Sequence, residues 1–268
     1  MTIDMIIEPA SRYARTNIIS VDPGDTVQDL LGIMARERVR HVMVRGSGEF
    51  ITVDNIFSLI YRMLSVARDP RHLETMKIGF LKTLRPPRVS GYISIAEAAR
   101  VMASTRLDFT LVDTEKGTGI LTVRDIIRAV EPSEARDPAI RYSTPRYPSV
   151  GPSSKVVDVV KTMGMHGVRS VLVLEGRSAV GVIPSLSVIG ALSHLGFHGL
   201  WDEALNVAHP VEAVAPATAS IGDTAHKMRE YDTEAVVLEV EGHVVGVVDE
   251  WGVIRALAGH GDRLVLGS

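Results

Sequence analysis

The stretch Gly119-Ile120-Leu121-Thr122-Val123-Arg124-Asp125-Ile126-Ile127 decides the fold. It predicts a short apolar strand that runs directly into a helix. A helix N-terminus presents unpaired N–H groups and about half a positive charge, so it favours an anion. Thr122 can offer its hydroxyl to a phosphate there, and Asp125 can accept from a sugar hydroxyl. The same pair has the spacing of a capping box, in which the two side chains serve the helix alone. Both interpretations stay open on this stretch.

The composition is that of an ordinary globular protein, with 268 residues, 46% hydrophobic residues, 23% charged residues and a net charge of −3. A balance so near neutral, without a long basic run, argues against nucleic-acid binding. The absence of cysteine excludes disulfides, thiolate catalysis and cysteine-ligated zinc. We expect a cytoplasmic protein without membrane insertion, because no signal peptide and no apolar run of about 18–20 residues is present.

Four methionines mark an internal repeat. They are separated by 68, 61 and 65 residues: Met34, Met102, Met163 and Met228. Around each, the sequence predicts a short strand, a helix, a hairpin of two apolar strands with a Gly-containing turn, and a second helix. The first helices are expected to start at Asp25-Thr26, Ser94, Ser153-Ser154 and Ser220, where N-cap residues stand. This pattern predicts an α+β protein of four β-α-β-β-α repeats.

The linkers predict a grouping of the repeats in twos. Residues 131–148 contain four prolines and suit a boundary between domains. We therefore predict a first pair at 1–133, with repeats at about 10–64 and 83–131, and a second pair at 140–268, with repeats at about 143–193 and 209–260. The apolar residues between Ser65 and Pro87 predict a helix that links the first two repeats.

Each repeat resembles the CBS domain. The resemblance rests on Ser94-Ile95-Ala96-Glu97-Ala98-Ala99 and on Gly119 to Ile126, and all four repeats match it in outline. It implies four CBS repeats in two modules, a layout similar to the adenine-nucleotide-sensing subunit of AMP-activated protein kinase. Members of the family typically bind adenosine-containing ligands and regulate a partner.

The resemblance assigns roles to the residues of the opening stretch. Its Thr or Ser reaches phosphate and its Asp reaches the ribose hydroxyls, which in this chain implies Thr122 and Asp125. The same motif brings in three neighbours as ligand-binding candidates: Gly119, Ile120 and Arg124.

The corresponding pairs in the other repeats are less complete. Thr52 with Asn55 keeps the hydroxyl but offers an amide without a carboxylate's strength. The third repeat has Pro184 with Ser187, and the fourth has Asp249 with Gly252. We therefore expect the first pair of repeats to hold the ligand, while Ser187 stays a candidate in the second.

A basic residue before the Val-rich strand is a further family feature. It is present as Arg40 and Arg169, whereas the second and fourth repeats have Asp108 and Glu234. We expect Arg40 to reach the phosphate of a ligand held by the second repeat, because a guanidinium suits that group. Thr16 and Thr83, upstream of the first strands, are candidates for the edge of the nucleotide.

We predict a non-catalytic regulatory protein that binds AMP, ADP or ATP in the cleft of a CBS pair and signals to an unidentified protein. No catalytic residue and no required cofactor is predicted. His194 and His198 have helix-face spacing but no third ligand, so no metal site is predicted. Two alternatives stay open: a ligand-free scaffold for oligomerisation or docking, and a sensor of S-adenosylmethionine. A homodimer is one assembly that the resemblance permits.

Overall fold

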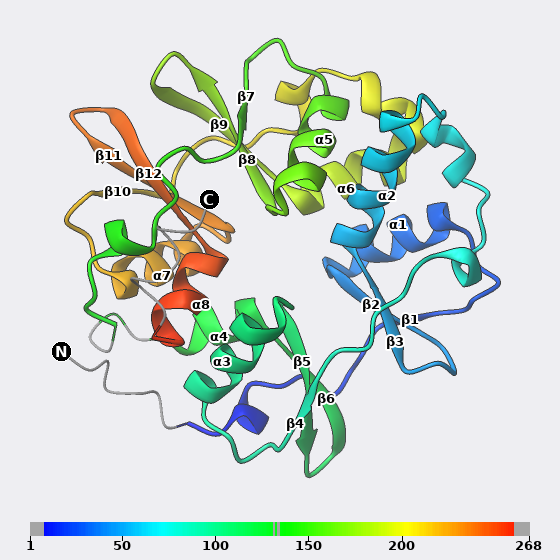
Figure 1. The fold of residues 1–268 in the computed structure, drawn as a ribbon, viewed down its shortest axis with the longest axis horizontal. Helices are drawn as coiled ribbons and strands as arrows, with labels where there is room; N and C mark the ends of the chain where they lie inside the picture. The colour runs from blue at the N-terminus through cyan, green and yellow to red at the C-terminus, as the bar shows by residue number, and fades with distance from the viewer. Residues whose placement is uncertain (1–7, 131, 133–134, 260–268) are drawn as a thin grey trace. The chain divides into compact units, whose positions relative to one another are not determined.

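The computed structural model describes residues 8–130, 132 and 135–259, which fold into four copies of one β-α-β-β-α repeat (Figure 1). Repeat 1 consists of β1 (Ser20–Val21), α1 (Val27–Glu37), β2 (His41–Val44), β3 (Glu49–Thr52) and α2 (Val53–Ser65). Repeat 2 consists of β4 (Arg88–Val89), α3 (Ile95–Thr105), β5 (Phe109–Thr114), β6 (Gly117–Thr122) and α4 (Val123–Ala129). Repeat 3 consists of β7 (Ser149–Val150), α5 (Val156–His166), β8 (Ser170–Glu175), β9 (Ser178–Pro184) and α6 (Ser185–Leu195). Repeat 4 consists of β10 (Val214–Pro216), α7 (Ile221–Glu230), β11 (Ala235–Val240), β12 (His243–Asp249) and α8 (Glu250–Leu257). The predicted α+β class and the four repeats are confirmed.

Each repeat contains one three-stranded sheet with the same topology. The first strand runs parallel to the central strand, as a helical crossover permits, and the third strand runs antiparallel to the central one. In the second repeat, Phe109 at the start of the central strand lies opposite Thr122 at the end of the third. The hairpin thus delivers the chain directly into the second helix at a fixed point of every repeat.

Most of the predicted helix starts are confirmed. Thr26, Ser94 and Ser220 are N-caps whose side chains accept from the backbone of the third helical residue. The prediction of Ser153-Ser154 was wrong, because α5 has Lys155 as its N-cap. There the Asp158 carboxylate accepts from the Lys155 backbone N–H at 3.0 Å. The acid three residues into the helix, rather than a preceding serine, marks this start.

The chain forms two compact units, each built from alternate repeats. Residues 19–85 and 148–211 hold repeats 1 and 3, and we call them the odd unit. Residues 1–18, 86–147 and 212–268 hold repeats 2 and 4, and we call them the even unit. Each unit therefore takes one repeat from each of the predicted sequential pairs, 1–133 and 140–268. Those pairs stay a prediction about which repeats share a ligand.

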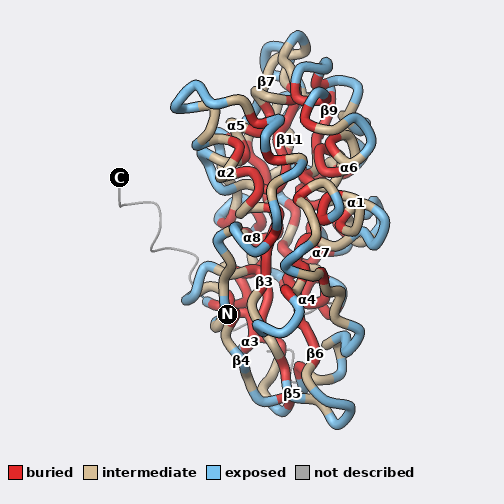
Figure 2. The backbone as a smooth tube through the Cα atoms, turned by 90° about the vertical axis from the view of Figure 1, so that its right-hand side faces the viewer, coloured by how far each residue is buried: buried red, intermediate tan, exposed pale blue. Residues whose placement is uncertain are grey.

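Helices pack the repeats together within each unit. In the odd unit α1 packs on α6 and α2 on α5, and in the even unit α3 packs on α8 and α4 on α7 (Figure 1). The four repeat-marking methionines are buried in these contacts, Met34 and Met163 in one core and Met102 and Met228 in the other. Figure 2 shows the buried strands and helix faces in red. Each unit thus has its own apolar core, which a single repeat is too small to build.

A linker residue extends every sheet beyond its third strand. Antiparallel bridges join Leu84 to Phe50, Arg15 to Ile120, His209 to Val182 and Thr144 to Val247. In each case the linker comes from the segment before a different repeat. The bridges cover part of a sheet edge that would otherwise present unpaired backbone groups.

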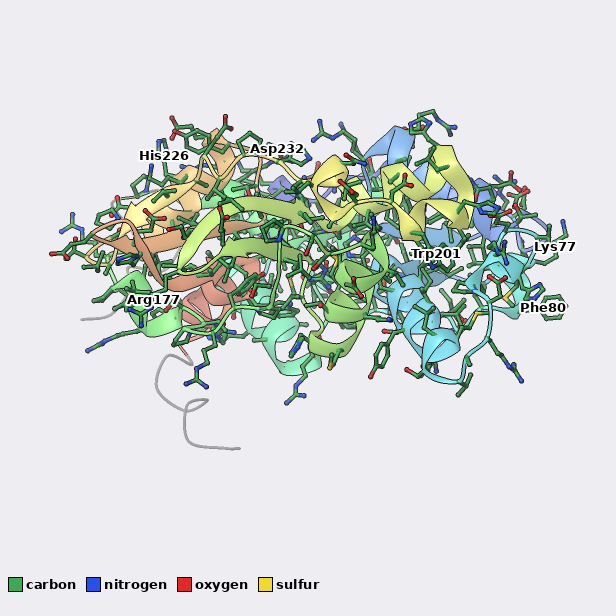
Figure 3. The ribbon with its side chains drawn as sticks, turned by 90° about the horizontal axis from the view of Figure 1, so that it is seen from above. Lys77, Phe80, Arg177, Trp201, His226 and Asp232 are labelled. Atoms are coloured by element: carbon green, nitrogen blue, oxygen red, sulfur yellow. The ribbon has the colours of Figure 1, made fainter. Side chains whose placement is uncertain are left out.

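The predicted helix between Ser65 and Pro87 was wrong. Two short 3-10 helices lie there, η2 (Pro70–Leu73) and η3 (Ile78–Phe80). Leu73 is buried, whereas Phe80 is 82% exposed and projects from the surface beside Lys77 (Figure 3). Gly79 lies within the apolar set that predicted one continuous helix, and glycine weakens a helix interior. Among the described residues, no helix has the length and apolar character needed to cross a membrane.

Candidate functional site

The β6–α4 junction is closed by a capping box. The Asp125 carboxylate accepts from the Thr122 backbone N–H at 2.9 Å and from the Thr122 hydroxyl at 2.7 Å, both through Oδ2. Both residues are buried. The capping interpretation of this stretch is confirmed, since the two side chains serve the helix start. Oδ1 of Asp125 takes no part in these bonds with Thr122.

Two arginines offset the charge of this buried carboxylate. Nη2 of Arg15 lies 3.5 Å from Asp125 Oδ2, and Nη1 of Arg128 lies 3.6 Å from Oδ1. The Asp125 side chain is 5% exposed, whereas the Arg15 side chain is 51% exposed. A carboxylate with so little access to water is stabilised by such partners. The junction therefore contains a buried carboxylate, that of Asp125, whose nearest guanidinium belongs to the exposed and long side chain of Arg15.

The segment before the first repeat brings Arg15 to this junction. Arg15 and Ile120 exchange two backbone hydrogen bonds of 2.9 Å. Gly119 makes the approach possible, because a Cβ there would lie 3.1 Å from Ala14 Cβ and 3.3 Å from the Arg15 carbonyl oxygen. Sequence reasoning missed Arg15. The available signal was this glycine, whose missing side chain leaves room for another chain segment.

Thr16 faces a different feature. It lines a cavity of about 530 Å³ at the turn between β5 and β6, together with Tyr92, Thr114 and Lys116. This turn lies at the opposite end of the hairpin from Thr122. The β6–α4 junction thus contains four of the predicted residues, Gly119, Ile120, Thr122 and Asp125. Thr16 lies nearer the hairpin turn, beside the cavity.

The β3–α2 junction of the odd unit has the same design with a neutral group. The Asn55 side-chain oxygen accepts from the Thr52 N–H at 2.9 Å and from the Thr52 hydroxyl at 3.0 Å. The first helical N–H, that of Val53, donates to the carbonyl oxygen of Arg40 at 3.0 Å. The structure therefore groups Arg40 with Thr52 and Asn55. Arg40 and Thr122 belong to different units, and a ligand that bridges them stays a prediction.

Thr83 lies at the other end of β3. Its hydroxyl donates to the carboxylate of Glu49, the first residue of that strand, and the Arg85 guanidinium lies 3.6 Å from the same carboxylate. Thr83 therefore lies at the start of β3, where Leu84 pairs with Phe50, whereas Thr52 is the last residue of that strand.

Of the remaining candidates, Arg169 and Arg124 contact side chains of the repeat packed against their own, and Ser187 contacts a linker side chain. Nη2 of Arg169 lies 2.5 Å from Asp54 Oδ2. Arg124 lies 3.5–3.6 Å from three carboxylates of repeat 4, those of Asp232, Glu234 and Glu250. The hydroxyl of Ser187 lies 2.7 Å from Nε2 of His209, whose backbone pairs with β9. Ligand contacts by Arg124, Arg169 and Ser187 stay predictions.

Within the described part of the chain, no group of three or more acidic or histidine side chains is arranged to hold a metal ion.

Comparison with known proteins agrees with this fold. No curated protein matches the chain. A solved Methanocaldococcus jannaschii protein, described as a candidate archaeal homologue of γ-AMPK, is similar with a TM-score of 0.77 and 18% identity over 92% of this chain and 99% of its own. An uncharacterised conserved Pyrococcus horikoshii protein has a TM-score of 0.61 and 17% identity over 92% of this chain and 98% of its own.

The family assignment comes from the sequence profile of the CBS domain. It matches residues 10–60, 81–132 and 207–259, which together make up more than half of the chain. Repeat 3 lies outside these matches, yet it has the same strands and helices in the same order. Its junction carries Pro184 in place of the hydroxyl residue, one departure from the pattern of the second repeat. The chain belongs to the CBS-domain family, with four repeats.

Proposed function

We propose that the protein is a non-catalytic sensor that binds an adenosine-containing ligand at the β6–α4 junction of the even unit. The candidates are AMP, ADP and ATP. The observation that supports this is the buried Asp125 carboxylate, which sits at a helix start beside the exposed guanidinium of Arg15. A cap needs no buried charge, because Asn55 performs the same task with an amide in the odd unit, and Asp29 caps α1 with a carboxylate at the surface.

In this proposal the ribose hydroxyls donate to Oδ1 of Asp125, while Oδ2 keeps its two bonds from Thr122. The guanidinium of Arg15 turns from the carboxylate to the phosphate, which it can hold with two parallel N–H donors. Ligand binding thereby changes the contacts of the segment before repeat 1, and an unidentified partner protein reads that change.

The strength of the signal is limited by thermodynamics. A ligand shifts an equilibrium between two conformations only by the difference in its affinity for them. The pair between Arg15 and Asp125 is the contact that distinguishes the two states here. Its separation of 3.5 Å and the exposure of Arg15 indicate a weak pair that a phosphate can displace.

Calorimetric titration of the full chain with AMP, ADP, ATP and S-adenosylmethionine measures the affinities, and thermal unfolding with and without each ligand measures the stabilisation. A ligand at 100 times its Kd should raise the free energy of unfolding by about 2.7 kcal/mol. We expect Asp125→Ala to abolish this gain. Asp249→Ala is the matched control, since Asp249 also caps a helix, accepting from the Gly252 N–H at 2.9 Å. The control variant should keep full binding.

Arg15→Ala separates the ligand classes. It should weaken AMP more than adenosine, because adenosine has no phosphate for the guanidinium to bind. Equal affinity for S-adenosylmethionine in the wild type and in Arg15→Ala, together with no binding of AMP, would favour the S-adenosylmethionine sensor. Lys116→Ala, which alters the cavity at the hairpin turn, should leave binding unchanged.

A ligand-free scaffold is the second candidate function. It is favoured by the bonds at the junction, where Thr122 and Asp125 already satisfy each other. Failure of every adenosine compound to stabilise the chain would contradict the sensor proposal and leave the scaffold.

A further inference from the structure

The two units use the same pair of positions with opposite charges. One position is the second residue of the second helix, Asp54 in repeat 1 and Arg124 in repeat 2. The other is the residue before the central strand, Arg169 in repeat 3 and Glu234 in repeat 4. In the odd unit Asp54 meets Arg169 at 2.5 Å, and in the even unit Arg124 meets Glu234 at 3.6 Å.

These pairs lie where charge has a large effect. The side chain of Arg169 is 8% exposed and that of Glu234 is 2% exposed. In the even unit Glu250 adds a second buried carboxylate 3.5 Å from Arg124, and Asp232 adds one at the surface (Figure 3). A like charge opposite a buried ion is unfavourable, because the buried group is poorly solvated by water and depends on its partner's opposite charge.

The crossed combination of repeats would bring like charges together at both places. Repeat 1 on repeat 4 would set Asp54 against Glu234, and repeat 2 on repeat 3 would set Arg124 against Arg169. The apolar helix faces make this distinction less sharply, since apolar contact is non-directional, although α1 and α5 bury Val and Leu where α3 and α7 bury smaller side chains at several positions.

A second difference between the units concerns size. Helix α2 extends through Ser65, whereas α4 ends at Ala129. Gly164 on α5 accommodates the longer helix, because a Cβ there would lie 3.0 Å from Tyr61 Cβ. The equivalent residue on α7 is Arg229, which donates to the carbonyl oxygens of Ile127, Arg128 and Val130 at the end of the shorter helix.

We propose that these two differences form a pairing code that makes repeat 1 pack with repeat 3 and repeat 2 with repeat 4. Charge and size both favour the observed pairs, and each also acts against the crossed pairs. In a crossed chain Arg229 would meet the continuous helix α2 and Gly164 would leave a gap beyond α4. The partner that each helix face selects is therefore one particular repeat of the same chain.

A sign-exchange variant, Asp54→Arg with Arg124→Asp, tests the charge component without changing the net charge. We expect a lower urea midpoint, with the equilibrium constant for unfolding raised at least about tenfold. Adding Arg169→Glu and Glu234→Arg should restore the midpoint. The matched control is Asp22→Arg with Arg88→Asp, which breaks the exposed pairs of Asp22 with Arg45 and of Arg88 with Asp113 and should change little.

Engineered disulfides report which repeats are paired, because the chain has no cysteine of its own. A Cβ on Gly32 would lie 3.9 Å from Ser193 Oγ, so Gly32→Cys with Ser193→Cys reports the observed pairing. Gly32→Cys with Ala258→Cys reports the crossed pairing, since Ala258 follows α8 where Ser193 stands in α6. We expect the first disulfide to form in the native background and to form less in the sign-exchange variant.

The outcomes decide the proposal even if the sign-exchange variant does not fold. A urea midpoint restored in the variant with all four charges exchanged supports the code, since stability then depends on opposite charges being paired and not on any single residue. A sign-exchange variant as stable as the control, or a fourfold variant that remains unfolded, would overturn the charge component. Gly164→Arg with Arg229→Gly tests the size component in the same way, and an unchanged midpoint would overturn it.

Discussion

The β3–α2 and β6–α4 junctions share a backbone and a threonine, and they differ in one functional group. Asn55 closes the first with an amide, and Asp125 closes the second with a carboxylate. The amide needs no counter-charge, whereas the buried carboxylate has guanidinium groups of Arg15 and Arg128 nearby. The comparison teaches that capping explains the hydrogen bonds at both junctions but not the burial of a charge at the second.

The largest expected effect concerns the approach of the N-terminal segment. Gly119→Glu should lower the free energy of unfolding by about 1–3 kcal/mol, because the new Cβ would lie 3.1 Å from Ala14 Cβ. Urea denaturation measures the loss. The junction of repeat 1 has Glu49 at the same position, so a side chain is accommodated there and not here.

Gly24→Ala is the control for this variant, since nothing lies within 4 Å of a Cβ at that position. Its free energy of unfolding should stay within about 0.5 kcal/mol of that of the wild type. An equally mild effect of Gly119→Glu would show that the N-terminal segment is not held closely against β6.

Removal of the threonine hydroxyl should affect the two junctions unequally. Thr122→Val deletes the 2.7 Å bond to a buried carboxylate, and we expect a loss of about 1–2 kcal/mol. Thr52→Val deletes a neutral bond of 3.0 Å and should cost about 0.5–1 kcal/mol. Thermal unfolding of both variants gives the comparison, and equal losses would mean that the charge adds nothing to this bond.

Exchange of the closing groups should alter binding more than stability. Asp125→Asn keeps an acceptor for Thr122 and loses the ion pairs with the exposed guanidinium groups of Arg15 and Arg128, about 0–1 kcal/mol. Its affinity for an adenosine ligand should nevertheless fall about tenfold, because hydrogen bonds to a charged acceptor are roughly twice as strong. Calorimetry measures the affinity, and unchanged binding in this variant would argue that the ribose contact lies elsewhere.

The smallest effect is expected at the exposed capping box of α1. Hydrogen bonds from the Thr26 side chain and backbone lower the pKa of Asp29 below its usual value near 3.8. A folded-state pKa below the unfolded one stabilises the protein above the unfolded value, and this contribution is lost as the pH falls through the folded pKa. Asp29→Asn should therefore slightly reduce the fall of the free energy of unfolding as the pH is lowered into the acid range. An unchanged slope between about pH 5 and pH 2 would contradict this.

The sequence predicted what depends on local pattern. The four repeats followed from methionines in register, and the capping box at Thr122 followed from its spacing to Asp125. Local spacing also misled, since the apolar residues around Met76 and Phe80 suggested one helix where the chain forms two separate 3-10 helices. The N-cap of α5 was misplaced because a carboxylate, not a serine, closes it.

What the sequence could not predict depends on distance along the chain. The pair of Arg169 with Asp54 joins residues 115 positions apart, and no local period encodes it. Arg15 reaches Asp125 only because its segment pairs with a strand of the second repeat rather than the first. Ligand binding by the candidate residues stays a prediction, since a helix start that caps itself and one that also holds a nucleotide share the same sequence.

The fact that each unit is built from alternate repeats bears on the evolutionary origin of the chain. The chain passes from one unit to the other at residues 18–19, 85–86, 147–148 and 211–212, so neither unit is a contiguous segment. A gene for two adjacent repeats would encode half of each unit and would leave the apolar helix faces of both uncovered. Such a protein would complete its units only by associating with a second copy. The present chain has the organisation expected of that dimer after duplication and fusion of its gene.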